Sequence, residues 1–519
     1  MLELPLIGSD PTLLQASSDV DQMAVLFESI EALFTAEILG LIIVGIVLGI
    51  ILGAIPGLGA VLGMTIVLPL TIVLDGTAAV VLLVSIYSGA LYGASISAIL
   101  VNVPGTAAAA ATTFDGYSMT EAGQSLKALE ISATASAIGG AFTMILLLVL
   151  IPYLQPIVLM FGAPQIFILA LFGIIMIGVI ASQGSFVKGI SGGMFGVLVM
   201  TIGVAHTRPV PRYTFDIIQL YDGLSFVAIL IGMFALGEML RISGIPGSVV
   251  EQSQKISGKR FEGINAVAND KFLTLKSGLI GMFVGSIPGV GASTSNFFSY
   301  AEAIRSSDTP ELFGDAHGPG IIAAEASNNA TVAGSLIPVL AFGIPGSAST
   351  AVLLGGLIMH GISPGIELFT VNLNLTYTMI LALVLGNVLI LGIGVLIVTR
   401  LGSYITQIET DVIIPIILVF SIVGALAIRS NWVDIITVFV FGWIAFYMKL
   451  FDYSVIALVL GAVLSGIIEA NFIRSMQRSG GDPIIFVNDP LSQFLIVMMI
   501  VFIAIAFFGD QIKRLLPGG

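Results

Sequence analysis

Apolar runs of about twenty residues recur along almost the whole chain, and this feature limits the fold more than any other. A run of that length crosses a lipid bilayer as one helix. Asp, Glu, Lys and Arg make up 9% of the 519 residues, whereas an ordinary soluble domain carries about a quarter. No polar stretch is long enough to form a separate soluble domain. The sequence therefore predicts an all-α polytopic membrane protein with about a dozen transmembrane segments.

The expected spans follow the apolar runs, and several of them are too short to cross a bilayer alone. They cover residues 38–53, 77–101, 128–151, 160–181, 186–204, 224–240, 275–286, 332–343, 372–399, 411–428, 432–449, 453–470 and 491–508. Before the first span, residues 20–36 mix apolar and acidic side chains. This mixture suits either a helix that lies in the membrane interface or a frayed acidic leader.

Charge and residue usage exclude several classes of function. The chain has 18 basic and 31 acidic residues, a net charge of -13, which argues against nucleic acid or an anionic membrane surface as a partner. It has no cysteine, so disulfides and thiolate metal sites are excluded. His206, His317 and His360 are far apart, and no motif for ATP hydrolysis, serine hydrolysis or zinc proteolysis occurs. We therefore expect no enzyme and no catalytic residue.

One third of the basic residues lie in the polar connection 241–276. Cytoplasmic loops of membrane proteins carry an excess of Lys and Arg, so this connection is expected in the cytoplasm. The first 37 residues contain acidic residues and no basic ones, which places the N-terminus outside.

Two short patterns occur twice. The octapeptide GAIPGLGA at residues 53–60 returns as GSIPGVGA at 285–292, and VPGTA at 103–107 returns as IPGSA at 344–348. The chain is thus expected to contain two homologous halves. The expected organisation is an acidic N-terminal segment (1–37), a first half with accessory spans (38–240), the basic connection (241–276), a second half (277–400) and C-terminal spans (401–519).

Each pattern places a Pro-Gly pair inside an apolar segment. Proline removes a backbone donor and glycine permits turns that other residues avoid, so a helix should break at each pair. Broken helices at membrane depth are tolerated where the freed backbone groups face protein or a water-filled site. Such breaks in two related halves indicate the midplane site of a transporter built from inverted repeats with re-entrant hairpins. A kink that serves only helix packing is the alternative.

Small and polar residues follow the breaks, and the half-helices that start there would direct free N–H groups at a carboxylate. Hydroxyl and amide oxygens could also bind Na⁺, for which Asn328 and Asn329 are the strongest candidates; no other metal site is expected. The predicted substrate and ion site comprises Pro56, Gly57, Gly59, Asn102, Pro104, Gly105, Thr106, Pro288, Gly289, Gly291, Ser293, Thr294, Asn296, Ser327, Asn328, Asn329, Pro345, Gly346 and Ser347.

Three acidic residues lie close to these motifs, and ionisable residues inside membrane segments commonly have a functional role. Glu302 and Glu325 could carry protons or brace a hairpin, and an interfacial, solvated position is favoured for both. Glu238 is expected to pair with Arg241. Alanine or valine at Gly57, Gly105, Gly289 and Gly346 is expected to impair transport more than at Gly45 or Gly461.

These motifs resemble the large membrane subunit of the tripartite tricarboxylate transporters over roughly residues 38–370. The resemblance rests on IPGLG at 55–59, YG at 92–93, ILVNVPG at 99–105, DGY at 115–117, RYTF at 212–215, DG at 222–223, GMFALGE at 232–238, PGVG at 288–291, EASNNA at 325–330, GIPGS at 343–347 and HGISPG at 360–365. The chain departs from the family pattern at Asp216 and Ile366, which lie outside the repeated breaks.

The resemblance implies a secondary transporter of the elevator type in the cytoplasmic (inner) membrane, which imports citrate-like tricarboxylates by symport with Na⁺ or H⁺. It implies two partners, a small four-span membrane subunit and an extracytoplasmic substrate-binding protein; a homodimer is a further expectation. No cofactor is expected beyond the coupling ion. The alternatives are the permease of a different tripartite system, for dicarboxylates or sialic acid, and a passive anion channel.

Overall fold

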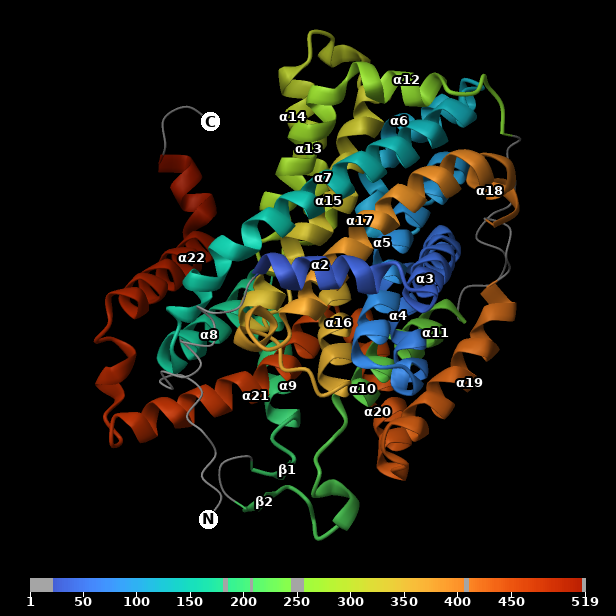
Figure 1. The fold of residues 1–519 in the computed structure, drawn as a ribbon. Helices are drawn as coiled ribbons and strands as arrows, with labels where there is room; N and C mark the ends of the chain where they lie inside the picture. Colours follow the sequence, from blue (N-terminus) through green and yellow to red (C-terminus); the bar gives the residue numbers. More distant parts are fainter. Residues whose placement is uncertain (1–21, 181–184, 206–208, 244–255, 406–409, 516–519) are drawn as a thin grey trace.

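The computed structural model describes residues 22–180, 185–205, 209–243, 256–405 and 410–515. The chain is built almost entirely from helices, and Figure 1 shows them packed around a central group that contains α5 and α15. A lipid bilayer leaves backbone polar groups without water partners, which favours helices because they satisfy these groups internally.

The first half starts with α2 (Gln22–Leu33) and α3 (Ala36–Ala54). The next elements are α4 (Gly59–Val67), η1 (Leu68–Val73), α5 (Gly76–Val101), η2 (Ala107–Ala109), α6 (Ala110–Glu121) and α7 (Ser125–Leu159). Accessory elements follow: α8 (Ala163–Ile180), α9 (Phe186–Val199), β1 (Gly203–Val204), β2 (Pro211–Arg212), η3 (Ile218–Leu220), α10 (Phe226–Leu230), the π-helical turn η4 (Ile231–Leu236) and α11 (Gly237–Ile242).

The second half contains α12 (Glu262–Asn269), α13 (Lys271–Gly285), α14 (Gly291–Ser306), η5 (Pro310–Leu312), α15 (Gly318–Phe342), α16 (Ala348–Met359), η6 (Ile366–Phe369) and α17 (Leu373–Ile393). The chain continues through the π-helical turn η7 (Gly394–Val398), α18 (Thr399–Ile405), α19 (Thr410–Arg429), α20 (Trp432–Leu450), α21 (Val455–Arg478), η8 (Pro483–Phe486) and α22 (Pro490–Leu515).

Helices stop at all four Pro-Gly pairs and restart within a few residues, as predicted. The breaks separate α3 from α4, α5 from η2, α13 from α14, and α15 from α16. The largest difference from the predicted bounds is at α15, which begins at Gly318 and not near residue 332. The polar residues 325–331 therefore lie inside this helix, where Glu325, Asn328 and Asn329 bond to groups on neighbouring helices.

Close helix contacts recur at matched positions in the two halves. A Cβ on Gly93 of α5 would lie 2.4 Å from the carbonyl oxygen of Ile50 on α3. At the matching position of the second half, a Cβ on Gly334 of α15 would lie 2.1 Å from the carbonyl oxygen of Met282 on α13. Glycine is required at both positions because the backbones touch.

The central helices α5 and α15 cross in opposite directions. The Tyr87 hydroxyl lies 3.5 Å from the Ser335 hydroxyl, and the Ser95 hydroxyl donates to Glu325 at 2.6 Å. Residue numbers thus rise along α5 as they fall along α15. From Ala78 to Leu100, α5 is buried on all sides, so α5 is an inner helix of the molecule and not a lipid-facing one.

Six of the described helical segments are long and apolar enough to cross a membrane. They are Ala36–Ala54, Gly76–Val101, Ser125–Leu159, Leu373–Gly402, Trp432–Leu450 and Val455–Arg478, and shorter apolar helices accompany them. This finding agrees with an all-α polytopic membrane protein, while the number of about a dozen spans stays a prediction. Figure 1 places α12 at one end of the molecule and the β1–β2 hairpin at the other.

Gly45 and Gly461, where substitution is expected to impair transport less than at the Pro-Gly glycines, are tightly packed. A Cβ on Gly461 would lie 1.9 Å from the Gly193 carbonyl oxygen, and a Cβ on Gly45 would lie 2.6 Å from the Ser85 Cβ. By contrast, a Cβ on Gly40 would have no neighbour within 4 Å.

We therefore expect Gly93→Val to destabilise the fold, because the new side chain must separate α3 from α5. The predicted loss is about 2 kcal/mol or more, measured as a lower melting temperature of the purified protein in detergent. Gly40→Val adds the same side chain to α3 in open space and serves as the control. Equal melting temperatures for the two variants would contradict the assigned packing.

Candidate functional site

A backbone hydrogen bond joins the two Pro-Gly loops of the first half. The Gly57 N–H donates to the Gly105 carbonyl oxygen at 3.3 Å. Gly57 has a φ of +89° and Asn102, the last residue before the second loop, has a φ of 58°. These left-handed conformations turn the chain out of α3 and α5, so the broken ends meet instead of continuing as helices.

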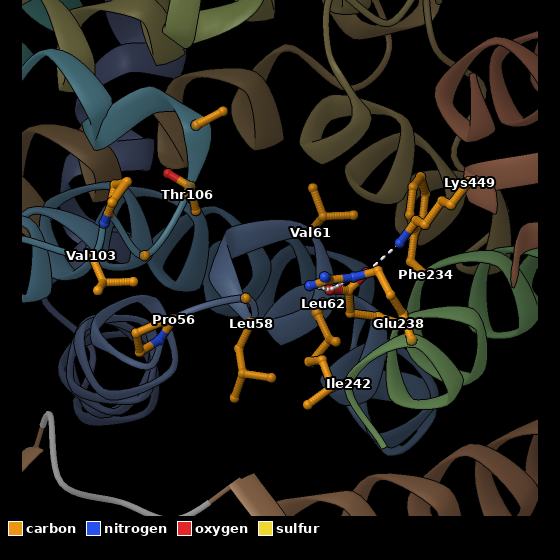
Figure 2. Close-up of a pocket in the computed structure, with 15 residues that line it drawn as sticks. Pro56, Leu58, Val61, Leu62, Val103, Thr106, Phe234, Glu238, Ile242 and Lys449 are labelled. Atoms are coloured by element: carbon orange, nitrogen blue, oxygen red, sulfur yellow. Dashed lines mark hydrogen bonds and ion pairs between the residues drawn. The ribbon is translucent and has the colours of Figure 1, made fainter. Parts of the chain in front are cut away.

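A cavity of about 510 Å³ lies beside these two loops. Figure 2 shows Pro56, Val103 and Thr106 on one side, and Phe234, Glu238 and Lys449 on the other. The cavity is lined by Pro56, Gly57, Leu58, Val61, Leu62, Val103, Pro104, Gly105, Thr106, Ala107, Phe234, Glu238, Arg241, Ile242 and Lys449. Mostly apolar walls with a few charged groups are typical of a small-molecule site.

Helix packing brings the charged groups together. Glu238 and Arg241 lie one turn apart on α11, directly after the π-helical turn η4. A Cβ on Gly237 would lie 2.6 Å from the Ala445 Cβ, so α11 and α20 approach closely. This approach brings Lys449, in the last turn of α20, to the Glu238 carboxylate.

The charges in the cavity do not cancel. Glu238 accepts from Arg241 Nε at 2.9 Å and from Arg241 Nη2 at 2.5 Å, and it also pairs with Lys449. The side chain of Glu238 is 12% exposed, whereas those of Arg241 and Lys449 are 43% and 32% exposed. Two cations against one carboxylate leave one excess positive charge, so the cavity favours an anion. The guanidinium of Arg241 suits a carboxylate in particular.

The second half repeats the backbone contact, but its loops do not line the cavity described above. The Gly289 N–H donates to the Gly346 carbonyl oxygen at 2.9 Å, which matches the bond between Gly57 and Gly105. Pro288, Pro345 and Ser347 lie in these loops. The Ser347 side chain caps α16 by accepting from the Thr350 N–H at 3.2 Å. Residues of the second half are absent from the lining of the cavity described above.

Three buried amide side chains lie near the central crossing. Asn328 donates to the Leu91 carbonyl oxygen at 3.1 Å, Asn329 donates to Asn387 Oδ1 at 3.1 Å, and Asn296 donates to the Ala108 carbonyl oxygen at 2.6 Å. The Oδ1 atom of each of these three residues has no partner within the described chain. A buried acceptor without a donor is costly, so such oxygens commonly face a bound ion or water.

The remaining residues of the predicted site lie at the starts of helices or in contacts between packed helices. Gly59 and Gly291 start α4 and α14 with φ values of 61° and 69°. Ser293 and Thr294 lie half-buried in the first turn of α14. Ser327 is buried and its hydroxyl lies 2.7 Å from that of Ser295. Of the predicted site, the structure places Pro56, Gly57, Pro104, Gly105 and Thr106 in the cavity.

The interfacial position expected for Glu325 is wrong. The side chain is fully buried, because α15 starts earlier than predicted and carries Glu325 into the centre. Its carboxylate accepts hydrogen bonds from four hydroxyls, those of Ser95, Thr112, Ser132 and Ser136. Glu302, by contrast, is on the surface with Arg305, 2.7 Å away, and the predicted pair of Glu238 with Arg241 is confirmed.

Sequence reasoning did not place Glu238, Arg241 or Lys449 in a site. The GMFALGE motif that ends at Glu238 gave a signal, since a charged residue at the end of an apolar run can mark a functional position. The sequence does not indicate Lys449 as a site residue, because this lysine lies at the end of an ordinary apolar run that is far from the repeated motifs. Only the packing of α20 against α11 brings it to the cavity.

Comparison with known proteins assigns the chain to a family. A family model described as "Tripartite tricarboxylate transporter TctA family" matches residues 39–460. The chain belongs to the TctA family. This family is one of transporters, and the match extends beyond residue 370, where the resemblance in motifs ended.

Two relatives come from Agrobacterium vitis. An uncharacterized 52.8 kDa protein in the TAR-I ttuC' 3' region is 30% identical over 467 residues, which cover 89% of this chain and 92% of the relative. An uncharacterized protein in the TAR-II ttuC' 3' region is 29% identical over 226 residues, which cover 44% of this chain and 93% of the relative. No solved structure matches this TctA chain.

We expect Arg241→Ala to weaken the binding of a carboxylate in the cavity. A hydrogen bond to a charged group contributes about 1.5–3 kcal/mol, so the dissociation constant should rise by roughly tenfold to a hundredfold. The measurement is calorimetric titration of the purified protein with citrate and other carboxylates. Arg305→Ala, which removes a surface cation next to Glu302, is the matched control. Unchanged affinity in a folded Arg241→Ala variant would exclude the cavity as the anion site.

Proposed function

We propose that this chain is the large membrane subunit of a secondary transporter that imports tricarboxylates or related carboxylates, such as citrate, by symport with Na⁺ or H⁺. The observation that carries the proposal is the cavity in which the two broken loops of the first half face Arg241 and Lys449. Its volume suits a small organic anion, and its excess positive charge suits a carboxylate. Glycine loops let the backbone approach such an anion closely.

We also propose that the two halves are inverted repeats, which would provide alternating access. The crossing of α5 and α15 in opposite directions, together with the matched backbone bonds at Gly57 and Gly289, is what two repeats of opposite orientation would produce. In such carriers one repeat-built unit moves against the rest of the protein. We propose an elevator movement in which both pairs of broken loops travel together.

A small four-span membrane subunit and an extracytoplasmic binding protein complete the proposed transporter. The support is membership of the TctA family, whose description names a tripartite system. We place the chain in the cytoplasmic membrane, with the binding protein delivering the substrate from outside. A homodimer is part of the same proposal.

The orientation of the repeats can be tested by cysteine labelling, because the chain has no native cysteine. Val73 and Leu312 follow the first break of each half and are 84% and 43% exposed. With inverted repeats, Val73→Cys and Leu312→Cys should react with a membrane-impermeant maleimide from opposite faces of inside-out and right-side-out vesicles. Reaction of both from the same face would refute the inversion.

Transport itself can be tested in proteoliposomes that contain this chain with its proposed partners. Uptake of radiolabelled citrate should depend on an inward gradient of Na⁺ or H⁺, because a symporter is driven by its coupling ion. Removing an orphan amide oxygen with Asn328→Ala or Asn329→Ala should abolish uptake or shift its cation dependence, while the expressed amount is unchanged. Uptake that equilibrates at the same rate without any cation gradient would instead identify a passive anion channel.

A further inference from the structure

The Glu325 carboxylate lies in a complete shell of hydroxyl groups. Oε1 accepts from Ser95 at 2.6 Å and from Thr112, while Oε2 accepts from Ser136 at 2.9 Å and from Ser132 at 3.1 Å. The four donors come from α5, α6 and α7 of the first half, whereas Glu325 belongs to α15 of the second half. The carboxylate is therefore held where the two halves meet.

No basic side chain neutralises this carboxylate. Within the part of the chain that the structure describes, none of the ion pairs includes Glu325. The helices packed around this carboxylate carry the titratable residues Tyr92 on α5, Asp115 on α6, Glu130 on α7 and Tyr300 on α14. Asp115 accepts from Tyr300, and Glu130 accepts from the Phe261 N–H, whereas the buried Tyr92 hydroxyl has no partner. An unpaired carboxylate at membrane depth is costly and commonly marks a proton relay.

We propose that Glu325 takes up and releases the coupling proton of this transporter, an inference that rests on the proposed symport. An ionised carboxylate offers about four lone-pair positions, and the four hydroxyls occupy all of them. A Na⁺ ion would find no free position on these oxygens. A proton needs none, because it converts one oxygen from an acceptor into a donor.

The hydroxyl shell can accommodate the proton without leaving an unpaired group. A proton from water that adds to Oε2 would form an O–H group that donates to the Ser136 hydroxyl oxygen. The Ser136 hydroxyl would then donate its own proton to the main-chain carbonyl oxygen of Glu325, which lies 3.5 Å away. Release of the proton to water on the other side restores the four original bonds. Every hydroxyl proton thus has an acceptor in both protonation states.

Thr112 links the protonation state of Glu325 to the cavity wall through α6. It lies on α6, which continues from η2 and from the loop that carries Gly105 and Thr106 into the cavity. Protonation weakens the bond from Thr112, because a neutral carboxyl group is a poorer acceptor than a carboxylate. The state of Glu325 therefore acts on the helix that supports one wall of the anion site.

The test compares wild-type protein with Glu325→Gln, which resembles the protonated carboxyl in shape and charge. Both are reconstituted with their proposed partners, the membrane potential is clamped at zero, and uptake of radiolabelled citrate is driven by a gradient of one pH unit. For one proton per substrate, one pH unit supports about tenfold accumulation, since it corresponds to about 1.4 kcal/mol. We expect about tenfold accumulation for wild type and none for Glu325→Gln.

Counterflow separates lost coupling from lost folding. Glu325→Gln should still exchange internal unlabelled citrate for external labelled citrate at equal pH on both sides, because exchange needs no net proton movement. Glu302→Gln, which removes a surface carboxylate, should keep both pH-driven uptake and exchange. Preparations are matched by amount and by melting temperature, so a loss of counterflow in a folded Glu325→Gln would assign the residue a structural role and overturn the proposal.

Two further outcomes would overturn the proton assignment. Glu325→Gln that still accumulates citrate with the pH gradient would show that another group carries the proton. Wild-type uptake that follows a Na⁺ gradient and ignores the pH gradient would leave the proposed symport intact while rejecting Glu325 as the proton carrier. Wild-type uptake that follows neither gradient would reject the symport itself, so the failures of the two proposals are distinguishable.

Discussion

Hydrogen bonding of the backbone at the four helix breaks is the constraint on which the rest of this structure depends. A bilayer offers no water to a broken helix, so each freed group needs a partner inside the protein. The bonds from Gly57 to Gly105 and from Gly289 to Gly346 meet this need in the same way in both halves. Because each loop is held by the other loop of its pair, the two loops of the first half can border the cavity without unfolding the helices that carry them.

Similar backbones carry different chemistry in the two halves. Ser347 uses its hydroxyl to cap α16, whereas Thr106, at the matching position of the first half, has a buried hydroxyl without a partner. The first pair of loops borders a cavity with Arg241 and Lys449, and the second pair does not. The two pairs of loops thus make similar backbone contacts, and the accessory helices α11 and α20 place two cations in the cavity beside the first pair.

The crossing of α5 with α15 concentrates buried polar groups at the centre of a very apolar chain. Glu325, Asn328 and Asn329 all lie on α15 and are fully buried. Each is expensive to bury, and packing alone would favour apolar residues at these positions. The partners of Glu325 and Asn328 come from the first half of the chain, whereas Asn329 bonds to Asn387 on α17 of the second half. The first two residues therefore fix how the halves meet, and the asparagines keep acceptor oxygens without a partner in the described chain.

The sequence by itself determined the membrane class, the paired Pro-Gly motifs and the four helix breaks, because each depends on local chemistry: run length, proline and glycine. It also indicated the buried asparagines, since adjacent amides are rare in an apolar segment. Only the tertiary structure decided which polar groups meet. Lys449 reaches Glu238 because α20 packs on α11, and the hydroxyls around Glu325 come from three helices that are distant in sequence. Such convergence depends on helix packing angles, and local sequence patterns do not encode them.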